Sequence, residues 1–544
     1  MDLKEDIHRF REEYTDEQID EAIHLLRTSA HNNVMSSATI ERTDIERLSG
    51  FTEERHAVTK TGKHQIQDSH LNPAYSLEEV AARQRAIREL EAEPGTRKDV
   101  EGFLQEYARM ERALGRLDDI LGPFSHTTVW EAADTTRKRK KVVKDLSDTA
   151  QEFVRNTKGR LESDYLRERI EGLHSFKGSS FDRVARSWRI YTSWRQGNRH
   201  AEVYFLPPSE VPFKYRGVGL SSSPVDLVES LLAVATGGVA YLSLPNFPQT
   251  AFIMLGSMGL TGFSIMGLIP RAWLARDFMD YQHSNSDFKQ LDKTVGQLDE
   301  VMAYLKYGES LEVKCLPALK DEPRHRLKIV EGYNPILLAE GGCVTPIDIE
   351  IGNGRMTFIT APNSAGKTRS CQTVTQIAVQ GQCGSYVPAR ECDLVIADHI
   401  FYQAPNFAAE GKHGRCGTEG AETRNIFWQA TPRTLAVLDE LVEGTTHKDK
   451  IRVSKDILWG FQVKGTDVVV ITHNYELAEE FKGPKQLLQV EYLDGIGSTR
   501  KLIEGVCKDS RVDEVLADIC FTKGHILATL VKQGYLKLGS IPSS

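Results

Sequence analysis

Three stretches of the chain are almost wholly apolar and rich in branched side chains: Met356–Thr360, residues 434–438 and residues 467–471. Short apolar runs of this kind predict buried β-strands, as in parallel sheets that are covered on both faces. Each run is followed closely by polar or charged residues. Because ligands bind at the carboxyl ends of strands in open α/β sheets, we expect the chemistry of this domain at those three ends.

Residues 1–200 follow a helical pattern instead. Residues 76–79 read S-L-E-E, a capping box that predicts the start of a helix ending near Pro94 and Gly95. In the next segment, apolar residues recur at helical spacing and predict core packing. They are Phe103, Tyr107, Met110 and Leu114. Residues 285–312 return to the same charged, amphipathic helical pattern.

Residues 230–270 contain no charged side chain, in a chain that is 26% charged overall. The two halves, 227–244 and 250–269, each have about the length that crosses a hydrocarbon core. Lys214 and Arg271 flank the pair, so the positive-inside tendency places both ends in the cytoplasm. We expect a membrane hairpin, with the rest of the chain cytoplasmic. The alternative is a hairpin buried in the core of a cytoplasmic protein.

The turn after the first apolar strand has the Walker A spacing, with alanine in place of its first glycine. In such a turn, backbone N–H groups and a helix N-terminus surround the β- and γ-phosphates of a nucleotide. Lys367 would neutralise phosphate charge, and the Thr368 hydroxyl would take a Mg²⁺ position. The predicted ATP-binding residues are Ala361, Pro362, Asn363, Ser364, Ala365, Gly366, Lys367 and Thr368.

The other two apolar strands end in residues that suit ATP hydrolysis. Asp439 can hold Mg²⁺ together with Thr368, and Glu440 can orient and deprotonate the attacking water. His473 can reach the γ-phosphate from the end of the third strand. Taken singly, the two acids could be a solvated strand end and His473 an ordinary loop histidine. Their order and spacing favour an ATPase, with Glu440 and His473 as catalytic residues and ATP and Mg²⁺ as cofactors.

Composition limits the function classes. At 544 residues and 40% hydrophobic composition, the chain is long enough for two or more domains with real cores. A net charge of −8 argues against a generally basic nucleic-acid binder. All eight cysteines follow residue 314 without a C-x-x-C pair, which indicates a reduced chain without structural zinc. The charged N-terminus lacks a signal-peptide core.

The densest basic run is R-K-R-K-K at residues 137–141, followed by Lys144. On a helix, this run would spread charge around most of the circumference. One interpretation is a solvated helix face, and the sharper one is a patch that contacts phosphates or anionic lipid. Tryptophans and arginines also alternate between residues 175 and 214, which suits base stacking or a membrane surface.

Six short motifs follow one another in the C-terminal half. Residues 362–368 read P-N-S-A-G-K-T, residues 384–389 G-S-Y-V-P-A, residues 398–401 D-H-I-F, residues 422–426 E-T-R-N-I, residues 439–446 D-E-L-V-E-G-T-T and residues 472–477 T-H-N-Y-E-L. In this order they resemble the motifs of the MutS family of DNA mismatch-repair ATPases. A weaker similarity to the helical core domain of that family covers residues 44–50 and 79–87.

The resemblance implies an ABC-type ATPase that works as a homodimer, with the 419–425 helix of one chain closing the nucleotide site of the other. It also implies DNA as a partner. Some positions depart from the family pattern: Ala361 replaces the first glycine, Gly414 stands near the expected signature serine, and Val442 with Glu443 replaces Gly-Arg. We expect these departures to affect hydrolysis and signalling across the dimer more than nucleotide binding.

The sequence therefore predicts an α/β P-loop ATPase domain of ABC type at residues 325–505, joined to an all-α helical core and lever region at residues 1–200. The remaining segments are a connector at 201–284 that holds the apolar helical hairpin 227–269, returning helices at 285–324, and C-terminal helices for dimer contact at 506–544.

The expected function is ATP hydrolysis by a dimer, coupled to movement of the attached helices, on DNA and at a membrane. Only about forty residues precede the helical core, which is too few for the family's mismatch-recognition and connector domains. One alternative is a soluble DNA-repair or recombination clamp without mismatch recognition. The other is an ATP-binding scaffold with little turnover.

Overall fold

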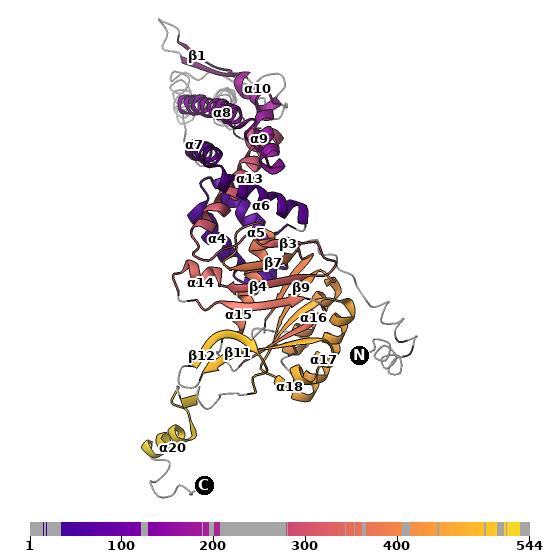
Figure 1. Ribbon diagram of the computed structural model, residues 1–544. Helices are drawn as coiled ribbons and strands as arrows, with labels where there is room; N and C mark the ends of the chain where they lie inside the picture. Colours follow the sequence, from indigo (N-terminus) through magenta and orange to yellow (C-terminus); the bar gives the residue numbers. More distant parts are fainter. Residues whose placement is uncertain are drawn as a thin grey trace, which may run out of the picture. The chain divides into compact units, whose positions relative to one another are not determined.

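The computed structural model of the chain divides into two compact units (Figure 1). The first comprises Met1–Arg55, Gln67–Gln84 and Tyr304–Ser544, and the second comprises His56–Ile66 and Arg85–Ala303. The residues that the structure describes are 15, 18, 34–74, 76–120, 129–187, 189–194, 201–206, 279, 281–342, 344–352, 354–361, 366–404, 414–442, 445–493, 497–508, 516–517 and 519–533.

The first unit is built around a six-stranded sheet with the order β12-β11-β6-β10-β9-β8. Its neighbouring strands are parallel except for β12, which is antiparallel to β11. Every residue of β6, β9 and β10 is buried, so these strands are apolar runs rather than alternating ones. The strands are β6 (Met356–Thr360), β8 (His399–Gln403), β9 (Thr434–Asp439), β10 (Asp467–Thr472), β11 (Lys485–Leu493) and β12 (Gly497–Glu504).

Helices pack on the faces of this sheet. Because successive side chains alternate between faces, Phe358, Leu438 and Val470 point to one side. There they form a single core with apolar residues of α16 (Gly414–Gln429), α17 (His447–Lys464) and α18 (Tyr475–Glu480). These three helices gather beside the strands in Figure 1. Helix α15 (Lys367–Gln382) follows β6 and contacts β9 and β4.

A second sheet of four strands completes the first unit, in the order β3-β7-β4-β5. In it, β4 is antiparallel to β5 and β7, and β3 is parallel to β7. Its strands are β3 (Ala318–Lys320), β4 (Arg326–Gly332), β5 (Ile347–Gly352) and β7 (Glu391–Val395). Three short helices also belong to this unit: α3 (Ser37–Arg42), which lies beside β8, α14 (Pro335–Ala339) and α20 (Lys523–Lys532).

The second unit is mainly helical. It contains α7 (Pro94–Ile120), α8 (Val129–Thr157), α9 (Asp164–Phe176) and α10 (Ser180–Ser187). The predicted apolar stripe of α7 is buried as expected, and its Phe103 stacks on Phe153 of α8 with ring centroids 4.5 Å apart. Four helices contribute residues to both units: α4 (Ile45–His56), α5 (Lys60–Leu71), α6 (Leu77–Ala92) and α13 (Ser286–Glu309).

The helical interpretation of residues 1–200 does not extend to its last part. Strand β1 (Arg189–Trp194) pairs with β2 (Ala201–Leu206) as an antiparallel hairpin. Both segments are rich in aromatic and β-branched residues, such as Ile190, Tyr191 and Thr192. These residue types favour the extended backbone, and local composition here outweighs the helical pattern that precedes it.

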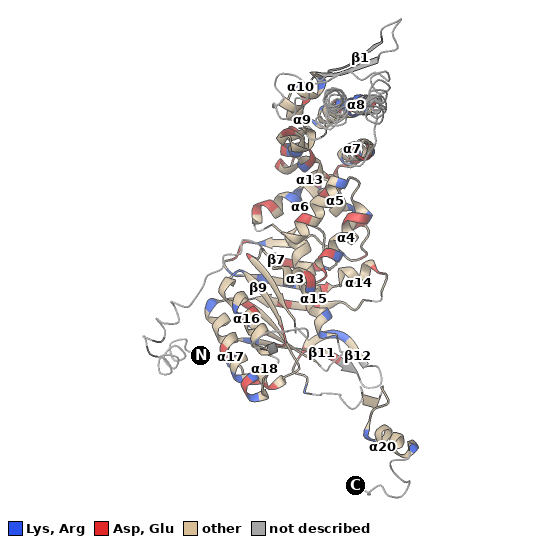
Figure 2. Ribbon diagram, turned by 180° about the vertical axis from the view of Figure 1, so that it is seen from behind, with Lys and Arg blue, Asp and Glu red and all other residues tan. Residues whose placement is uncertain are grey.

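The charge of residues 137–141 is not spread around helix α8, as the sequence suggested. Arg139 is fully buried, and its Nε donates a hydrogen bond to Gln282 Oε1 at 2.8 Å. Lys138 pairs with Asp134 at 2.6 Å. The other four cations recur at helical spacing along one side of α8 and form a stripe. Figure 2 colours the lysines and arginines of the chain blue. This α8 stripe consists of Arg137, Lys140, Lys141 and Lys144.

The apolar stretch 227–269 lies outside the described residues, so the membrane hairpin stays a prediction. Within the described part of the chain, none of the helices combines the length and the apolar character needed to cross a membrane.

Candidate nucleotide-binding site

The predicted phosphate-binding turn connects β6 to α15. Ala361 follows β6 and is buried, while Gly366 precedes α15 with a φ of 100°, which glycine adopts without strain. Lys367 begins the helix, and its buried Nζ donates a hydrogen bond to the Ala361 carbonyl at 3.1 Å. The lysine therefore reaches back across the turn to its first residue. The other predicted members of the turn, 362–365, lie outside the described residues.

The two predicted Mg²⁺ ligands lie side by side. Thr368 Oγ1 donates a hydrogen bond to Asp439 Oδ2 at 3.1 Å. Mg²⁺ in proteins is usually held by one or two carboxylates together with substrate phosphates and water. In the described residues, no group of three or more His, Cys, Asp or Glu side chains is placed to hold a metal. A hydroxyl and a carboxylate in contact fit that description, and they would hold a magnesium ion whose remaining ligands are phosphates and water.

The sheet order brings the three predicted strand ends together. β10 lies between β6 and β9, and all three run parallel, so the phosphate turn, Asp439 with Glu440, and His473 emerge at one edge. The backbone N–H of Glu440 donates to the Ile471 carbonyl at 3.0 Å, which fixes the end of β9 against β10. Residues about a hundred positions apart in the sequence thus form one polar cluster.

Glu440 is the centre of this cluster and is 9% exposed. Its Oε1 accepts hydrogen bonds from the His473 backbone N–H at 3.0 Å and contacts His473 Nδ1 at 2.7 Å. Lys367 Nζ lies 3.8 Å from the same oxygen. The other oxygen of Glu440, Oε2, accepts hydrogen bonds from Lys450 Nζ at 3.2 Å and from Thr472 Oγ1 at 3.3 Å. Both carboxylate oxygens are therefore held by two or more groups.

The neighbouring acids Asp439 and Glu440 have opposite pKa shifts. Burial raises the pKa of Asp439 to about 6, and the negative charge of Glu440 adds to this. Burial also opposes ionisation of Glu440, but the hydrogen bond from His473 and the charges of Lys450, His473 and Lys367 outweigh it and lower its pKa to about 2. Glu440 is thus the acid that the surrounding cations keep ionised.

Lys450 was not among the residues predicted from the sequence. It lies in the first turn of α17 and is 7% exposed. The sequence carries a signal that could have revealed it, because Lys450 precedes Ser454 and Leu458 at four-residue spacing on the buried side of the helix. Lysine is rarely buried without an anionic partner, so a lysine on an apolar helix face marks a charge pair.

Two residues after β9 have a backbone conformation that is unusual for their side chains. Glu440 has a φ of 57° and Val442 a φ of 53°. Positive φ is a marked outlier for a β-branched residue such as valine. Val442 stands where the resemblance places a glycine, so this departure from the family pattern coincides with backbone strain of roughly 1–3 kcal/mol.

A small pocket adjoins Glu440 on the side of α17 and α18. Its volume is about 290 Å³, and Lys450, His473 and Tyr475 are among its lining residues. His473 is half exposed there, with 52% of its side chain accessible. The histidine thus contacts Glu440 on one side and solvent on the other, a position from which it can meet a ligand.

Helix α16 carries the E-T-R-N-I motif and is fastened to the rest of the first unit by polar contacts. Thr423 Oγ1 donates to Gln403 Oε1 at 2.9 Å, which ties the helix to the end of β8. Arg42 of α3 binds both carboxylate oxygens of Glu422, and its Nη2 lies 3.1 Å from Oε2. The helix is therefore held in a defined position beside the sheet.

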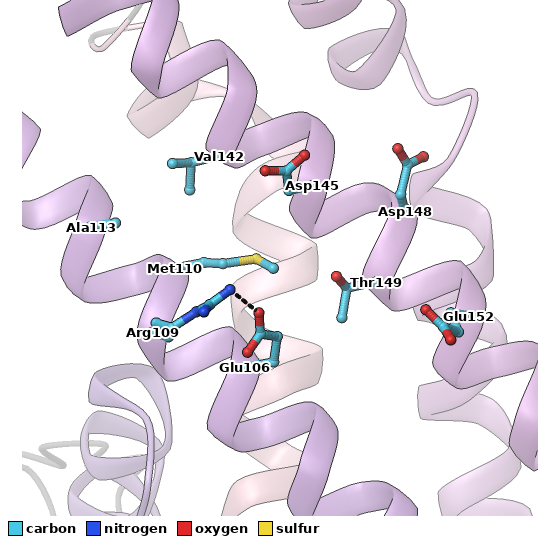
Figure 3. Close-up of a pocket in the computed structure, with 9 residues that line it drawn as sticks. All are labelled: Glu106, Arg109, Met110, Ala113, Val142, Asp145, Asp148, Thr149 and Glu152. Carbon is cyan, nitrogen blue, oxygen red and sulfur yellow. Dashed lines mark hydrogen bonds and ion pairs between the residues drawn. The ribbon is translucent and has the colours of Figure 1, made fainter.

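A pocket in the second unit has a different character. It encloses about 520 Å³ between α7 and α8, and Figure 3 shows the carboxylates of Asp145, Asp148 and Glu152 along its α8 side. Met110 supplies apolar surface, and Arg109 is paired with Glu106. An acidic lining repels phosphate, so this pocket does not suit a nucleotide.

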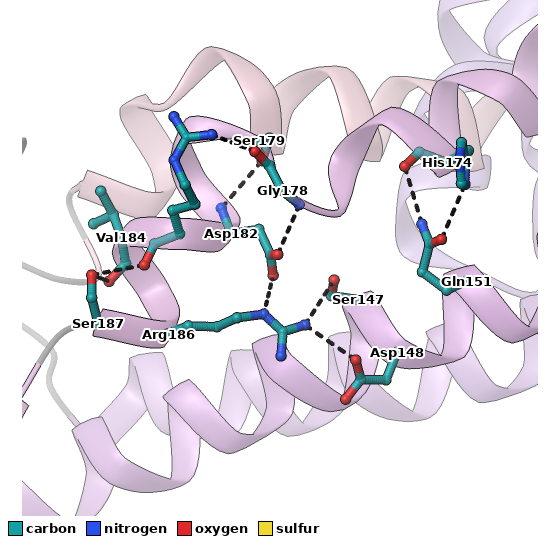
Figure 4. A network of polar contacts seen from close by, with 11 residues as sticks. Ser147, Asp148, Gln151, His174, Gly178, Ser179, Asp182, Val184, Arg186 and Ser187 are labelled. Atoms are coloured by element: carbon teal, nitrogen blue, oxygen red, sulfur yellow. Dashed lines mark hydrogen bonds and ion pairs between the residues drawn. The ribbon is translucent and has the colours of Figure 1, made fainter.

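Charged residues of α8 and α10 hold these two helices of the second unit together. Asp182 is 3% exposed and accepts hydrogen bonds from Arg186 Nε at 2.8 Å and from the Gly178 backbone N–H at 2.9 Å. Arg186 Nη2 also donates to Asp148 Oδ1 at 3.1 Å and Ser147 Oγ at 3.2 Å (Figure 4). This network fastens α10 to α8 and accounts for Arg186 without a ligand.

Fold and site together define a P-loop ATPase domain, with a parallel sheet and Walker A and Walker B residues at adjacent strand ends. Residues 357–510 match the family MutS domain V. The chain carries the ATPase domain of the MutS family, which is of ABC type, and it is homologous over part of its length to MutS, MutS2 and Msh proteins. The predicted family is therefore confirmed for this domain.

Three relatives illustrate the similarity. The "DNA mismatch repair protein MutS" of Syntrophobacter fumaroxidans is 31% identical over 218 residues, which are 38% of this chain and 23% of the relative. The "Endonuclease MutS2" of Gemmatimonas aurantiaca is 30% identical over 181 residues, 32% of this chain and 22% of the relative. The "DNA mismatch repair protein msh3" of Aspergillus oryzae is 34% identical over 139 residues, which are 24% of this chain and 12% of the relative. The chain thus spans about a quarter or less of the length of these relatives.

Proposed function

We propose that this chain binds ATP with Mg²⁺ and hydrolyses it at the cluster around Glu440. Lys367 neutralises phosphate charge, Thr368 and Asp439 hold the metal ion, and His473 contacts the γ-phosphate. Glu440 takes a proton from water while the water oxygen bonds to the γ-phosphorus. The bond from that phosphorus to the bridging oxygen breaks, and ADP and phosphate leave.

One observation carries this proposal. A buried lysine, a threonine hydroxyl, two buried acids and a half-exposed histidine converge from three adjacent strand ends. A buried cation next to two buried carboxylates is costly to form unless the groups pair or bind a ligand. A metal-bound triphosphate supplies negative charge for Lys367 and a positive ion for Asp439, so it matches both needs.

We also propose that two copies of the chain form the working ATPase. Helix α20 is apolar, with Ile526, Leu527 and Leu530 in its sequence, yet none of its residues is buried. Phe521, just before the helix, is 59% exposed. Exposed apolar residues grouped in this way are typical of surfaces that contact another chain. A second copy would cover them and would present its α16 helix to the nucleotide.

DNA is the proposed partner of the second unit. The α8 stripe presents four cations over about two turns of one helix, which is typical of contacts to successive phosphates. Such contacts give affinity without sequence selection and weaken as salt rises. The predicted membrane hairpin at 227–269 is not part of this proposal, because no described residue supports it.

A second candidate function is an ATP-dependent switch with little turnover. The strained backbone at Val442 and the complete engagement of Glu440 favour it, because a base whose lone pairs are all occupied cannot accept a proton. In this case ATP binding would change the association of two chains, and hydrolysis would be slow.

The test of the proposed function is steady-state hydrolysis by the full chain with ATP and Mg²⁺. We expect phosphate release that stops when EDTA removes the metal and that falls by about 100-fold or more in Thr368→Val. ATP binding without phosphate release would favour the switch, and a chain that neither binds nor hydrolyses ATP would contradict both functions.

The DNA proposal has a separate test. A variant with Arg137, Lys141 and Lys144 replaced by Gln should bind duplex DNA more weakly and with a smaller salt dependence.

A further inference from the structure

Lys450 combines burial, charge and a specific partner in a way that calls for a role. It follows Thr446, which caps α17 by accepting a hydrogen bond from the Asp449 backbone N–H at 3.3 Å. The helix start is therefore fixed, and with it the direction of the Lys450 side chain. Its Nζ reaches Glu440 Oε2 at 3.2 Å, across the turn that leaves β9.

The two oxygens of Glu440 have different kinds of partner. Oε1 contacts His473 and Lys367, which are both expected to turn toward phosphate when ATP binds. Oε2 contacts Lys450 and Thr472, neither of which belongs to the proposed phosphate or metal ligands. Nucleotide binding would therefore open a position on Oε1, which keeps its hydrogen bond from the His473 backbone N–H, and would leave Oε2 held.

We propose that Lys450 is a positioning residue that anchors Oε2 of Glu440, so that Oε1 is presented to the attacking water. The inference rests on the proposed ATPase function and adds a residue to it. Asp439 and a bound triphosphate both repel the Glu440 carboxylate. Lys450 supplies the positive charge that holds the base in place once Lys367 is engaged with phosphate.

The test compares variants of one helix in the full-length chain. Lys450→Met removes the charge and keeps an apolar side chain of similar reach, while Lys450→Arg keeps the charge. Lys455→Met is the matched control, because Lys455 lies on the same helix and its Nζ pairs with Glu480 Oε2 at 2.8 Å on the surface. For each chain, kcat and KM for Mg-ATP are measured together with binding of a fluorescent ATP analogue.

We expect Lys450→Met to lower kcat by about 10- to 100-fold, with KM and analogue binding within about threefold of the parent. Lys450→Arg should recover a large part of kcat, and Lys455→Met should leave kcat and KM unchanged. If Lys450 served folding alone, Lys450→Met would lower both analogue binding and kcat, and Lys450→Arg would behave like Lys450→Met. If Lys450→Met does not fold, Lys450→Gln keeps a hydrogen-bond donor without the charge and should show the same loss of kcat.

A double variant tests whether Lys450 acts through Glu440. In a Glu440→Gln background, Lys450→Met should reduce residual turnover by less than about twofold, because the group that it positions is already gone. Unchanged or higher kcat in Lys450→Met, or a full further loss in the double variant, would overturn the inference while leaving the ATPase intact. A parent chain without Mg²⁺-dependent hydrolysis would overturn the proposed function and this inference with it.

Discussion

The two ends of the central sheet both bury an acid, and the two acids differ in the direction of their pKa shift. At the carboxyl end, cations and hydrogen bonds overcome burial and lower the pKa of Glu440 to about 2. At the amino end, burial raises the pKa of Asp467, the first residue of β10, to about 7. His325 faces it at 3.9 Å, and burial lowers the pKa of this histidine to about 3, so it is neutral.

The difference shows what separates a site from a buried charge. At both ends, burial alone would favour the neutral acid. At the amino end, the charges of Arg324 and Arg355 lower the pKa of Asp467 too little to offset burial. At the carboxyl end, Lys367, Lys450 and His473 lie directly against the acid, and Walker A and Walker B residues meet there. Burial of an acid is therefore weak support for function, and convergence of cations from separate elements is strong support.

The largest expected effect comes from removing a cation at the carboxyl end. Lys367→Ala should weaken ATP binding by about 100-fold or more, because the proposed role of this lysine is to neutralise phosphate charge. Binding is measured by titration with ATP in the presence of Mg²⁺. Lys448→Ala, an exposed lysine at the start of α17, is the control and should bind ATP normally. Normal ATP binding in Lys367→Ala would show that the cations at the carboxyl end of the sheet are not needed to hold a nucleotide.

The amino end should respond to pH. Because burial raises the folded-state pKa of Asp467 to about 7, the stability linked to its protonated form is present below about pH 4 and is lost as pH rises through 7. The side chain of Asp467→Asn cannot ionise, so at pH 8.5 the variant should have a free energy of unfolding up to roughly 4 kcal/mol higher than the parent. We expect this as a higher unfolding temperature. The difference should shrink as pH falls, to roughly 1.5 kcal/mol at pH 5.

Asp321→Asn, at an exposed position of the same unit, is the control for Asp467 and should show no pH-dependent difference. A lower unfolding temperature for Asp467→Asn at pH 8.5 would mean that the Asp467 carboxylate stabilises the fold. The two ends of the sheet would then be alike.

A smaller effect is expected at the pair that anchors helix α16. Arg42→Gln should lower the free energy of unfolding by about 1 kcal/mol, because it removes a bidentate, partly buried ion pair with Glu422. If α16 closes the site of a second chain, the variant should also reduce ATP-dependent dimer formation in sedimentation. The control is Arg47→Gln, whose pair with Glu340 is more exposed. Equal losses in both variants would contradict a special role for the Arg42 contact.

The parts of the fold that the sequence predicts best are the buried strands that end directly before a polar residue of the site. The buried strands β6, β9 and β10, and the residues at their ends, follow from apolar runs and motif spacing. The contact between Lys450 and Glu440 could not be predicted in this way. The two residues are ten positions apart, and the path of the turn between them depends on the positive φ of Glu440 and Val442. The β1–β2 hairpin was missed because long helical segments dominate that part of the chain.

By our proposal, the cluster around Glu440 hydrolyses ATP. The most direct test is single-turnover cleavage of ATP by the full chain with Mg²⁺, comparing the parent with Glu440→Gln. We predict that both bind ATP, and that the parent releases phosphate about 100-fold or more faster than the variant. Equal rates of phosphate release would contradict the claim and would remove Glu440 as the base.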